Sequence, residues 1–252
     1  MPENNTLGVV IITKNEEKNI GRCLESVKWA DEIIVVDSGS TDKTIDIAKS
    51  YQAKIYTQPW LGFGLQKNKA INYCTSDWVL SLDADEEVST VLRESIQQAI
   101  KDNSHNLYQF KRLSQFCGRW VQHGDWGRDI IVRLFKRGVA YFSEDIVHEK
   151  LIFKEKAKII SGILYHYSQP HIAVSLKKMN EYSNNTASVL FAKGKKASLL
   201  KASLHKHWTF FRSFVMRCGF LDGGRGYLIA KLSAYGAYFK YIKLWEKWHN
   251  DK

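Results

Sequence analysis

Apolar runs alternate with amphipathic stretches through the first hundred residues. The runs "LGVVIIT" (7–13), "EIIVVD" (32–37) and "DWVLSLD" (77–83) have the length and composition of strands buried on both faces, and "AKIYTQ" is a shorter candidate strand. "GLQKNKAINYC" is predicted to be helical. The other stretches repeat apolar residues at helical spacing, namely Ile20, Cys23, Leu24 and Val27, then Thr44, Ile47, Ala48 and Tyr51. Repeated strand–helix units predict a parallel sheet with helices on both faces.

Polar residues stand where three of the predicted strands end. Thr13, Asp37 and Asp83 are each the last residue of an apolar run. Ligands of open α/β sheets bind beyond the carboxyl ends of the strands. We therefore expect these side chains to converge on one edge of the sheet, with Asn15 capping the helix that follows the first strand.

The pattern changes after about residue 107. The segments "LYQFKR", "IIVRLFKR" and "LIFKEKAKIISGILYHY" are rich in strand-forming residues and predict an antiparallel addition to the sheet. Beyond Pro170 the chain is mostly helical in pattern. The sequence therefore predicts an α/β domain over residues 1–170 and a helical region over residues 171–252.

Charge is distributed unevenly between these two parts. The chain has 252 residues, is 44% apolar, and carries a net charge of +11. Residues 171–252 hold 15 Lys and Arg against 4 Asp and Glu, whereas residues 1–170 hold 22 of each kind. The basic excess predicts a polyanionic partner for the last third, either an anionic membrane surface or nucleic acid.

The four cysteines are scattered without Cys-x-x-Cys spacing, which argues against a zinc site and a disulfide framework. Free thiols fit a reducing cytosol, and the first ten residues lack the pattern of a signal peptide.

The stretch "SLDADEEV" is the most concentrated candidate for chemistry. Asp83 and Asp85 are two residues apart, so in an extended backbone they point the same way. Mg²⁺ is typically held by one or two carboxylates together with substrate phosphates. The competing interpretation is an acidic helix start, which the helix dipole favours; Glu86 and Glu87 fit it better than they fit metal ligands.

Taken together, "VVIITKNEEKNIGRCLESV", "EIIVVDSGSTDKT" and "SLDADEEV" resemble a family 2 glycosyltransferase of the GT-A fold. Within that family, "WLGFGLQKNKAI", "RLFKR", "VHEKL" and "GFLDGGRGY" are similar to the lipopolysaccharide inner-core β-glucosyltransferases, which add glucose to heptose. The resemblance implies a UDP-sugar donor, a divalent metal (Mg²⁺ or Mn²⁺) and a lipid-linked saccharide acceptor.

The resemblance also implies roles for the residues that end the strands. It places Asp37 on the uracil or ribose, Thr13, Asn15 and Glu16 around the base, Asp83 near the ribose and metal, and Asp85 on the metal. Alternatively, Asp37 only begins the "DSGSTD" turn. Ser40, Thr41 and Asp42 suit helix capping better than ligand binding.

Other polar residues complete the expected site. Lys67 or Lys69 can reach the diphosphate as a point charge, and we choose Lys69. For an inverting transfer, the general base is sought in "FSEDIVHEKL". It offers three acids, which are Glu149 (favoured), Asp145 (second choice) and Glu144. His148 and His166 suit structural roles better than metal or phosphate binding.

Acceptor contacts are assigned to Trp126, whose flat face can stack on a sugar, and to Arg133. A core position is an equal alternative for Trp126, because aromatic residues dominate protein cores. "QFCGRW" resembles the Q-x-x-R-W element of processive synthases, but it has one residue too many and precedes the proposed base. We therefore expect transfer of a single sugar.

The last fifty residues interleave aromatic residues with Lys and Arg. Three lysines inside "YLIAKLSAYGAYFKYIKLW" make a membrane span costly, so a helix lying in the membrane interface fits better. "LDGGRG" is predicted to be the turn between two such helices. An ordinary helical appendage is the alternative. Nucleic-acid binding is disfavoured, since no RNP-like, KH or zinc-finger pattern is present.

These patterns predict a metal-dependent inverting glycosyltransferase, cytoplasmic and peripheral on the inner face of a bacterial membrane. Transfer to a polyprenyl phosphate, nucleotidyl transfer and a basic binding module are the alternatives. "TKNEEKN" lacks the glycines that a nucleotidyltransferase phosphate loop would have.

Overall fold

The computed structural model describes residues 5–144, 149–169 and 171–250. The chain divides into two compact units. Unit 1 comprises Met1–Arg112 and Ile130–Tyr167, and unit 2 comprises Leu113–Asp129 and Ser168–Lys252. The sequence-based division at residue 170 differs from this one in two respects. Unit 2 begins slightly earlier, at Ser168, and the segment Leu113–Asp129 groups with the C-terminal helices, although the sequence pattern assigned it to the first domain.

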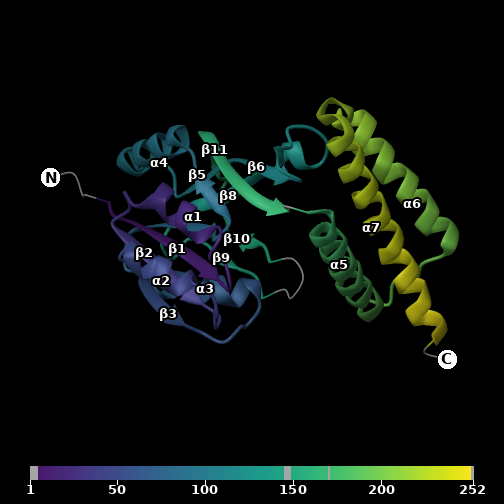
Figure 1. Ribbon diagram of the computed structural model, residues 1–252, viewed down its shortest axis with the longest axis horizontal. Helices are drawn as coiled ribbons and strands as arrows, with labels where there is room; N and C mark the ends of the chain where they lie inside the picture. Colours follow the sequence, from purple (N-terminus) through teal and green to yellow (C-terminus); the bar gives the residue numbers. More distant parts are fainter. Residues whose placement is uncertain (1–4, 145–148, 170, 251–252) are drawn as a thin grey trace. The chain divides into compact units, whose positions relative to one another are not determined.

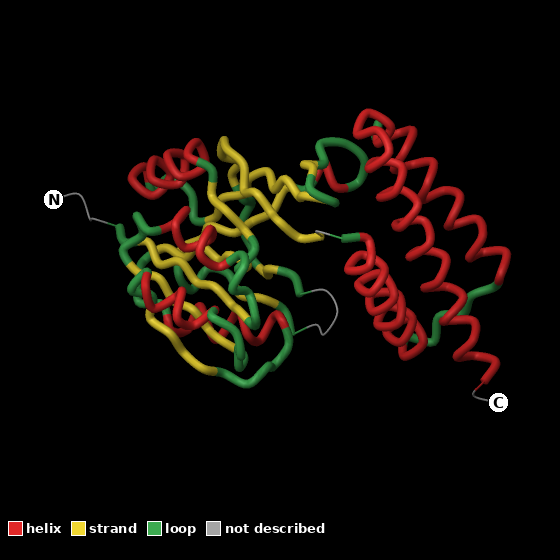
Figure 2. The backbone as a smooth tube through the Cα atoms, viewed as in Figure 1, coloured by secondary structure: helices red, strands yellow, loops and turns green. Residues whose placement is uncertain are grey.

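A mixed sheet forms the frame of unit 1 (Figures 1 and 2). Its strands lie in the order β3-β2-β1-β4-β8-β6-β11-β5. The parallel part contains β1 (Leu7–Thr13), β2 (Glu32–Asp37), β3 (Lys54–Thr57) and β4 (Trp78–Asp83). The antiparallel part adds β5 (Glu86–Val88), β6 (Leu107–Phe116), β8 (Ile130–Lys136) and β11 (Lys158–Gln169). The predicted parallel core with an antiparallel addition is confirmed.

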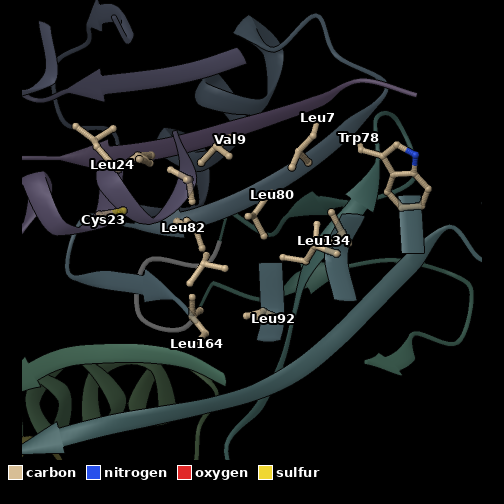
Figure 3. Packing of buried hydrophobic residues seen from close by; sticks show 14 of the residues in the cluster. Leu7, Val9, Cys23, Leu24, Trp78, Leu80, Leu82, Leu92, Leu134 and Leu164 are labelled. Atoms are coloured by element: carbon tan, nitrogen blue, oxygen red, sulfur yellow. The ribbon is translucent and has the colours of Figure 1, made fainter. Parts of the chain in front are cut away.

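Alternation along the central strand separates two hydrophobic layers. Val9 and Ile11 of β1 face one layer, and Val10 and Ile12 face the other. Helices α1 (Ile20–Val27), α2 (Thr44–Ser50) and α4 (Thr90–Asp102) pack in the first layer, part of which Figure 3 shows around Leu80 and Leu82. Helix α3 (Phe63–Tyr73) packs in the second, together with the hairpin of β9 (Tyr141–Phe142) and β10 (Leu151–Ile152).

Two local expectations are wrong. Asn15 does not cap α1, because that helix begins at Ile20 with Asn19 in the cap position. Glu86 and Glu87 do not begin a helix; they belong to β5, which pairs with β11. The cap of α4 is Ser89, whose hydroxyl accepts a hydrogen bond from the backbone N–H of Leu92.

Unit 2 is mainly helical (Figure 2). Its helices are α5 (Ile172–Ala192), α6 (Leu199–Phe211) and α7 (Gly223–Asn250). The chain passes from α6 to α7 through the π-helical turn η2 (Arg212–Met216) and the 3-10 turn η3 (Gly219–Asp222). The turn therefore lies earlier than predicted, because only the first two residues of "LDGGRG" belong to η3 and the other four already belong to α7. Within the part of the chain that the structure describes, no helix combines the length and apolar character needed to cross a bilayer.

The segment Leu113–Asp129 holds β7 (Arg119–Trp120) and the 3-10 turn η1 (Trp126–Arg128), and carboxylates tie it to the helices of unit 2. Asp222 of η3 accepts hydrogen bonds from the backbone N–H groups of Gln122 and His123 and also contacts the His123 ring. Asp125 forms ion pairs with Arg212 and Arg217. Phe116 and Val121 are buried in a small cluster with Ile229 of α7. These contacts explain why the segment belongs to unit 2.

Candidate active site

The ends of the parallel strands meet as the sequence predicts. In the sheet register, Thr13 is the partner of Asp37, and Ile12 is the partner of Asp83. The three polar residues Thr13, Asp37 and Asp83 therefore lie on neighbouring strands at one edge, which is where α/β sheets bind ligands.

Asp37 organises the turn that follows β2. Its Oδ2 accepts hydrogen bonds from the backbone N–H groups of Gly39 (2.8 Å) and Ser40 (2.9 Å), and its Oδ1 accepts one from the Ser40 hydroxyl. The side chain is buried. Asp37 therefore has the turn-forming role that the sequence left open. Any contact between Asp37 and a sugar-nucleotide substrate would use the remaining lone pairs of its carboxylate.

Two loops at this edge are tied together by polar contacts. Asn15, which has a left-handed backbone (φ 56°), accepts a hydrogen bond from the Thr41 N–H and donates its own N–H to Ser40. The Glu16 N–H donates to Thr44 at the start of α2. Asp42 accepts a hydrogen bond from the N–H of Thr44, the first residue of α2, but Lys43 occupies the cap position of that helix instead of the predicted Ser40, Thr41 or Asp42. The loop of Asn15 and Glu16 is therefore fixed against the loop of Asp37.

Thr13 presents a buried hydroxyl in this region. The residue is 5% exposed, and in the described part of the chain its Oγ1 has no hydrogen-bond partner. Buried hydroxyls usually have partners. An unpaired hydroxyl at the ligand-binding edge fits contact with a bound molecule.

Lys67 links two of the candidate acids. Its ammonium nitrogen lies 2.9 Å from Asp83 Oδ1 and 3.1 Å from Glu149 Oε1, and the side chain is only 3% exposed. The strand end and the segment that carries the candidate base therefore share one buried cation, although they are 66 residues apart in the sequence.

A second cation holds the other oxygen of Asp83. Arg133 of β8 lies 2.8 Å from Asp83 Oδ2 and is itself buried. Burial opposes the ionisation of Asp83, but Lys67 and Arg133 outweigh it, so the pKa of Asp83 lies well below its ordinary value. For Arg133, burial disfavours the charge and Asp83 restores it, which leaves the pKa of Arg133 raised. Arg133, expected on the acceptor, is engaged with Asp83.

Glu86 supports this arrangement from β5. Its Oε2 accepts a hydrogen bond from the backbone N–H of Asp83 (2.9 Å), and its Oε1 lies 3.2 Å from Arg112 and 3.8 Å from Arg133. This role of Glu86 was not predicted from the sequence, because Glu86 and Glu87 were interpreted as carboxylates at a helix start. The alternation of a strand, which turns Glu86 inward, was the available signal.

The two lysines of α3 have different environments. Lys67 is buried against Asp83, whereas Lys69 is exposed on the same helix. Residues two positions apart in a helix face nearly opposite directions. Since Lys67 faces the site, we replace the sequence-based choice of Lys69 with Lys67.

Helix α3 also holds the hairpin that leads to Glu149. The Asn68 side chain makes two hydrogen bonds of 2.8 Å with the backbone N–H and C=O of Phe142. Gly64 lies so close to the hairpin that a Cβ there would be 1.9 Å from the carbonyl oxygen of Ser143. These contacts position Glu149 beside Lys67. Glu144 is exposed, and Asp145 and His148 lie outside the described residues.

Asp85 lies beside the imidazole of His166, a residue for which the sequence favoured a structural role over metal or phosphate binding. His166 of β11 lies with its Nε2 3.5 Å from Asp85 Oδ2, because β11 pairs with β5 and the Tyr167 N–H donates to the Asp85 carbonyl. Carboxylate oxygens suit both Mg²⁺ and Mn²⁺, and imidazole is a common ligand of divalent transition metals. Among the described residues, no group of three or more acids, histidines or cysteines forms a complete metal cage. Asp85 and His166 are two candidate ligands for a divalent metal, whose remaining ligands would have to come from a diphosphate and water.

Trp126 lies in unit 2. Its ring packs edge-on against Phe116, with centroids 5.8 Å apart, next to the small cluster that contains Val121 and Ile229. The structure thus favours the packing alternative for Trp126.

Comparison with known proteins agrees with this geometry. Residues 8–181 match the family described as Glycosyl transferase family 2. The chain belongs to glycosyltransferase family 2. It is 35% identical over 253 residues to an uncharacterised glycosyltransferase of Rickettsia typhi, covering 95% of this chain and 87% of the relative. It is 28% identical to the lipopolysaccharide core biosynthesis glycosyltransferase LpsC of Rhizobium meliloti, covering 90% of each chain.

A solved structure shares the fold of this glycosyltransferase. The crystal structure of S. aureus TarS 1–349 in complex with UDP-GlcNAc superimposes with a TM-score of 0.52 at 14% identity, covering 98% of this chain and 92% of TarS. The predicted GT-A fold, with a Rossmann-like core and a C-terminal helical region, is confirmed.

Proposed function

We propose that this glycosyltransferase moves a hexose, glucose from UDP-glucose, onto a heptose of a lipid-linked saccharide of the lipopolysaccharide core, with inversion at the anomeric carbon. The main support is the cluster at the sheet edge, where buried Lys67 contacts Asp83 and Glu149. The similarity to LpsC supports a core-saccharide acceptor.

The residues divide the work as follows. Thr13, Asn15, Glu16 and Asp37 surround the nucleoside, and Lys67 and Arg133 keep Asp83 ionised and fixed beside it. Asp85 and His166 would hold the divalent metal, while both oxygens of Asp83 are engaged by Lys67 and Arg133. When bound there, the metal would supply positive charge to the departing diphosphate.

Glu149 acts as the general base. It removes the proton from the acceptor hydroxyl while that oxygen bonds to the anomeric carbon and the bond from that carbon to UDP breaks. Its side chain is 22% exposed, so an acceptor can reach it. Asp145 is the competing base.

A donor screen tests the proposal. We expect UDP-glucose with Mn²⁺ or Mg²⁺ to raise the melting temperature of the wild-type protein more than other UDP- or GDP-sugars do. Asp85→Ala should lose the metal-dependent part of that shift. Glu149→Gln should keep it but lose about 10²–10⁴-fold in turnover. Full turnover in Glu149→Gln, combined with its loss in Asp145→Asn, would move the base to Asp145.

The basic helical region gives this enzyme a second expected partner. A lipid-linked acceptor places the reaction at a membrane, and we propose that residues 171–252 attach the protein to the anionic cytoplasmic face of the inner membrane. The excess of 15 cationic over 4 anionic side chains supports attraction to anionic headgroups.

A further inference from the structure

One face of α6 is apolar and exposed. Leu200, Leu204, Trp208 and Phe211 are 70%, 62%, 52% and 48% exposed. At 100° per residue these four side chains fall within an arc of about 80° on the helix. We call these four residues the α6 stripe. Val215 and Met216 of η2, which are also exposed, follow it along the chain.

The opposite face of α6 is occupied by α7. Ala202 is fully buried, the His205 ring packs on Tyr241 with centroids 4.6 Å apart, and the Lys206 ammonium lies 4.5 Å from the centre of the Tyr235 ring. In Figure 1, α7 lies between α5 and α6. One face of α6 therefore packs against α7, and the opposite face carries the exposed α6 stripe.

The charges around the stripe indicate what covers it. Residues 193–217 contain seven Lys and Arg and no Asp or Glu. Lys193, Lys195, Lys196 and Lys201 are exposed beside the beginning of α6. A second copy of this chain would bring like charges together across a two-fold interface. A bilayer with anionic lipids offers acyl chains for the stripe and negative headgroups for the lysines at the same time.

We propose that the α6 stripe is the face that enters the anionic lipid surface, with α6 lying parallel to the membrane plane. Trp208 suits this position, since its indole has an apolar body and a polar N–H, a combination enriched at membrane interfaces. The inference rests on the proposed function only for the presence of a membrane at the reaction, and it adds the surface that makes the contact.

Two double variants of the full chain test the proposal. Leu204→Gln with Phe211→Gln changes the stripe, whereas Leu176→Gln with Val189→Gln changes exposed apolar residues of α5, which are 47% and 40% exposed. Co-sedimentation is measured with vesicles of phosphatidylcholine alone and with about one third phosphatidylglycerol. We expect the stripe variant to lose about tenfold or more in affinity for the anionic vesicles, and the α5 variant to bind like the wild type.

Brominated lipids report insertion directly. They should quench the fluorescence of the wild-type protein more than that of Trp208→Phe. Equal vesicle binding by the two double variants, or a wild-type dimer that only the stripe variant disrupts, would overturn the proposal. So would tighter binding to single-stranded nucleic acid than to anionic vesicles. Hydrolysis of the UDP-sugar needs no membrane. A protein that hydrolyses no UDP-sugar would therefore contradict the proposed function, whereas the vesicle measurements would still test the membrane contact of the α6 stripe.

Discussion

Lys67 combines almost complete burial with two carboxylate partners, a costly arrangement unless the charges balance. We predict that Lys67→Met leaves Asp83 and Glu149 without their shared cation. Removing one partner of a buried ion pair typically costs about 3–5 kcal/mol. The expected result is a lower melting temperature together with a loss of donor binding, measured by thermal shift with and without UDP.

Lys69→Met is the matched control, because Lys69 is an exposed lysine on the same helix. It should keep both stability and UDP binding. If Lys69→Met weakens UDP binding and Lys67→Met does not, the sequence-based choice of Lys69 was correct and the contacts of Lys67 serve folding alone.

Glu32 gives a prediction about pH. Burial opposes its ionisation, but Lys54 at 2.8 Å and hydrogen bonds from Thr75 and Ser76 prevail and lower the pKa of Glu32 to about 2. The folded pKa is below the unfolded value near 4.5. The stabilisation is therefore present above about pH 4.5 and is lost as the pH falls toward 2.

We expect Glu32→Gln to lower the free energy of unfolding at neutral pH by on the order of 1–3 kcal/mol, with the difference shrinking below about pH 4.5. Urea titrations at several pH values measure it. Glu25→Gln, which removes an exposed pair with Lys28, should have almost no effect at any pH. If Glu32→Gln lowers the free energy of unfolding by the same amount at every pH in this range, the charge of the Glu32 carboxylate does not contribute to stability.

At the scale of elements, the apolar runs predicted β1, β2 and β4 with bounds within a residue of those observed. Continuous burial leaves little alternative for such runs. The positions of Glu86 and Glu149 were harder, because β5 and β10 are only three and two residues long and take their places from pairing with distant strands or hairpin partners. No local pattern encodes that pairing. His166 is near Asp85 for the same reason.

The contact of α3 with the hairpin of β9 and β10 is testable. Asn68→Ala removes both hydrogen bonds to Phe142 and frees the hairpin that leads to Glu149. Displacing a catalytic group by about 1 Å can cost about 10²-fold in rate. We expect turnover to fall by about that factor with little change in UDP affinity. Asn72→Ala, at an exposed asparagine one turn later in α3, is the control and should behave like the wild type. Parallel losses in UDP affinity and turnover would contradict a role confined to the hairpin.

For the whole molecule, the charge shift and the helical pattern located the C-terminal region, but they gave no sign that Leu113–Asp129 joins it. The segment Leu113–Asp129 connects β6 to β8. The strand residues that flank it, Lys111 and Ile130, pair directly in the sheet, so the segment is an insertion between two neighbouring strands. Its apolar residues Phe116 and Val121 are buried within unit 2 against Ile229 of α7. The sequence indicates that such aromatic and aliphatic residues are buried, but it does not specify whether they are buried in unit 1 or in unit 2.

This organisation predicts how the chain tolerates truncation. A protein ending at residue 169 loses Ile229, Asp222, Arg212 and Arg217, so Phe116 and Val121 become exposed and Asp125 loses its two ion pairs. We expect that form to bind a hydrophobic dye and aggregate. A second form, in which a short Asn-Gly turn also replaces Leu113–Asp129, closes β6 and β8 as a simple hairpin and should stay monomeric. Light scattering and dye fluorescence compare the two. If the simple truncation is as well behaved as the hairpin form, the segment does not depend on the C-terminal helices, and a division of the chain at residue 170 is sufficient.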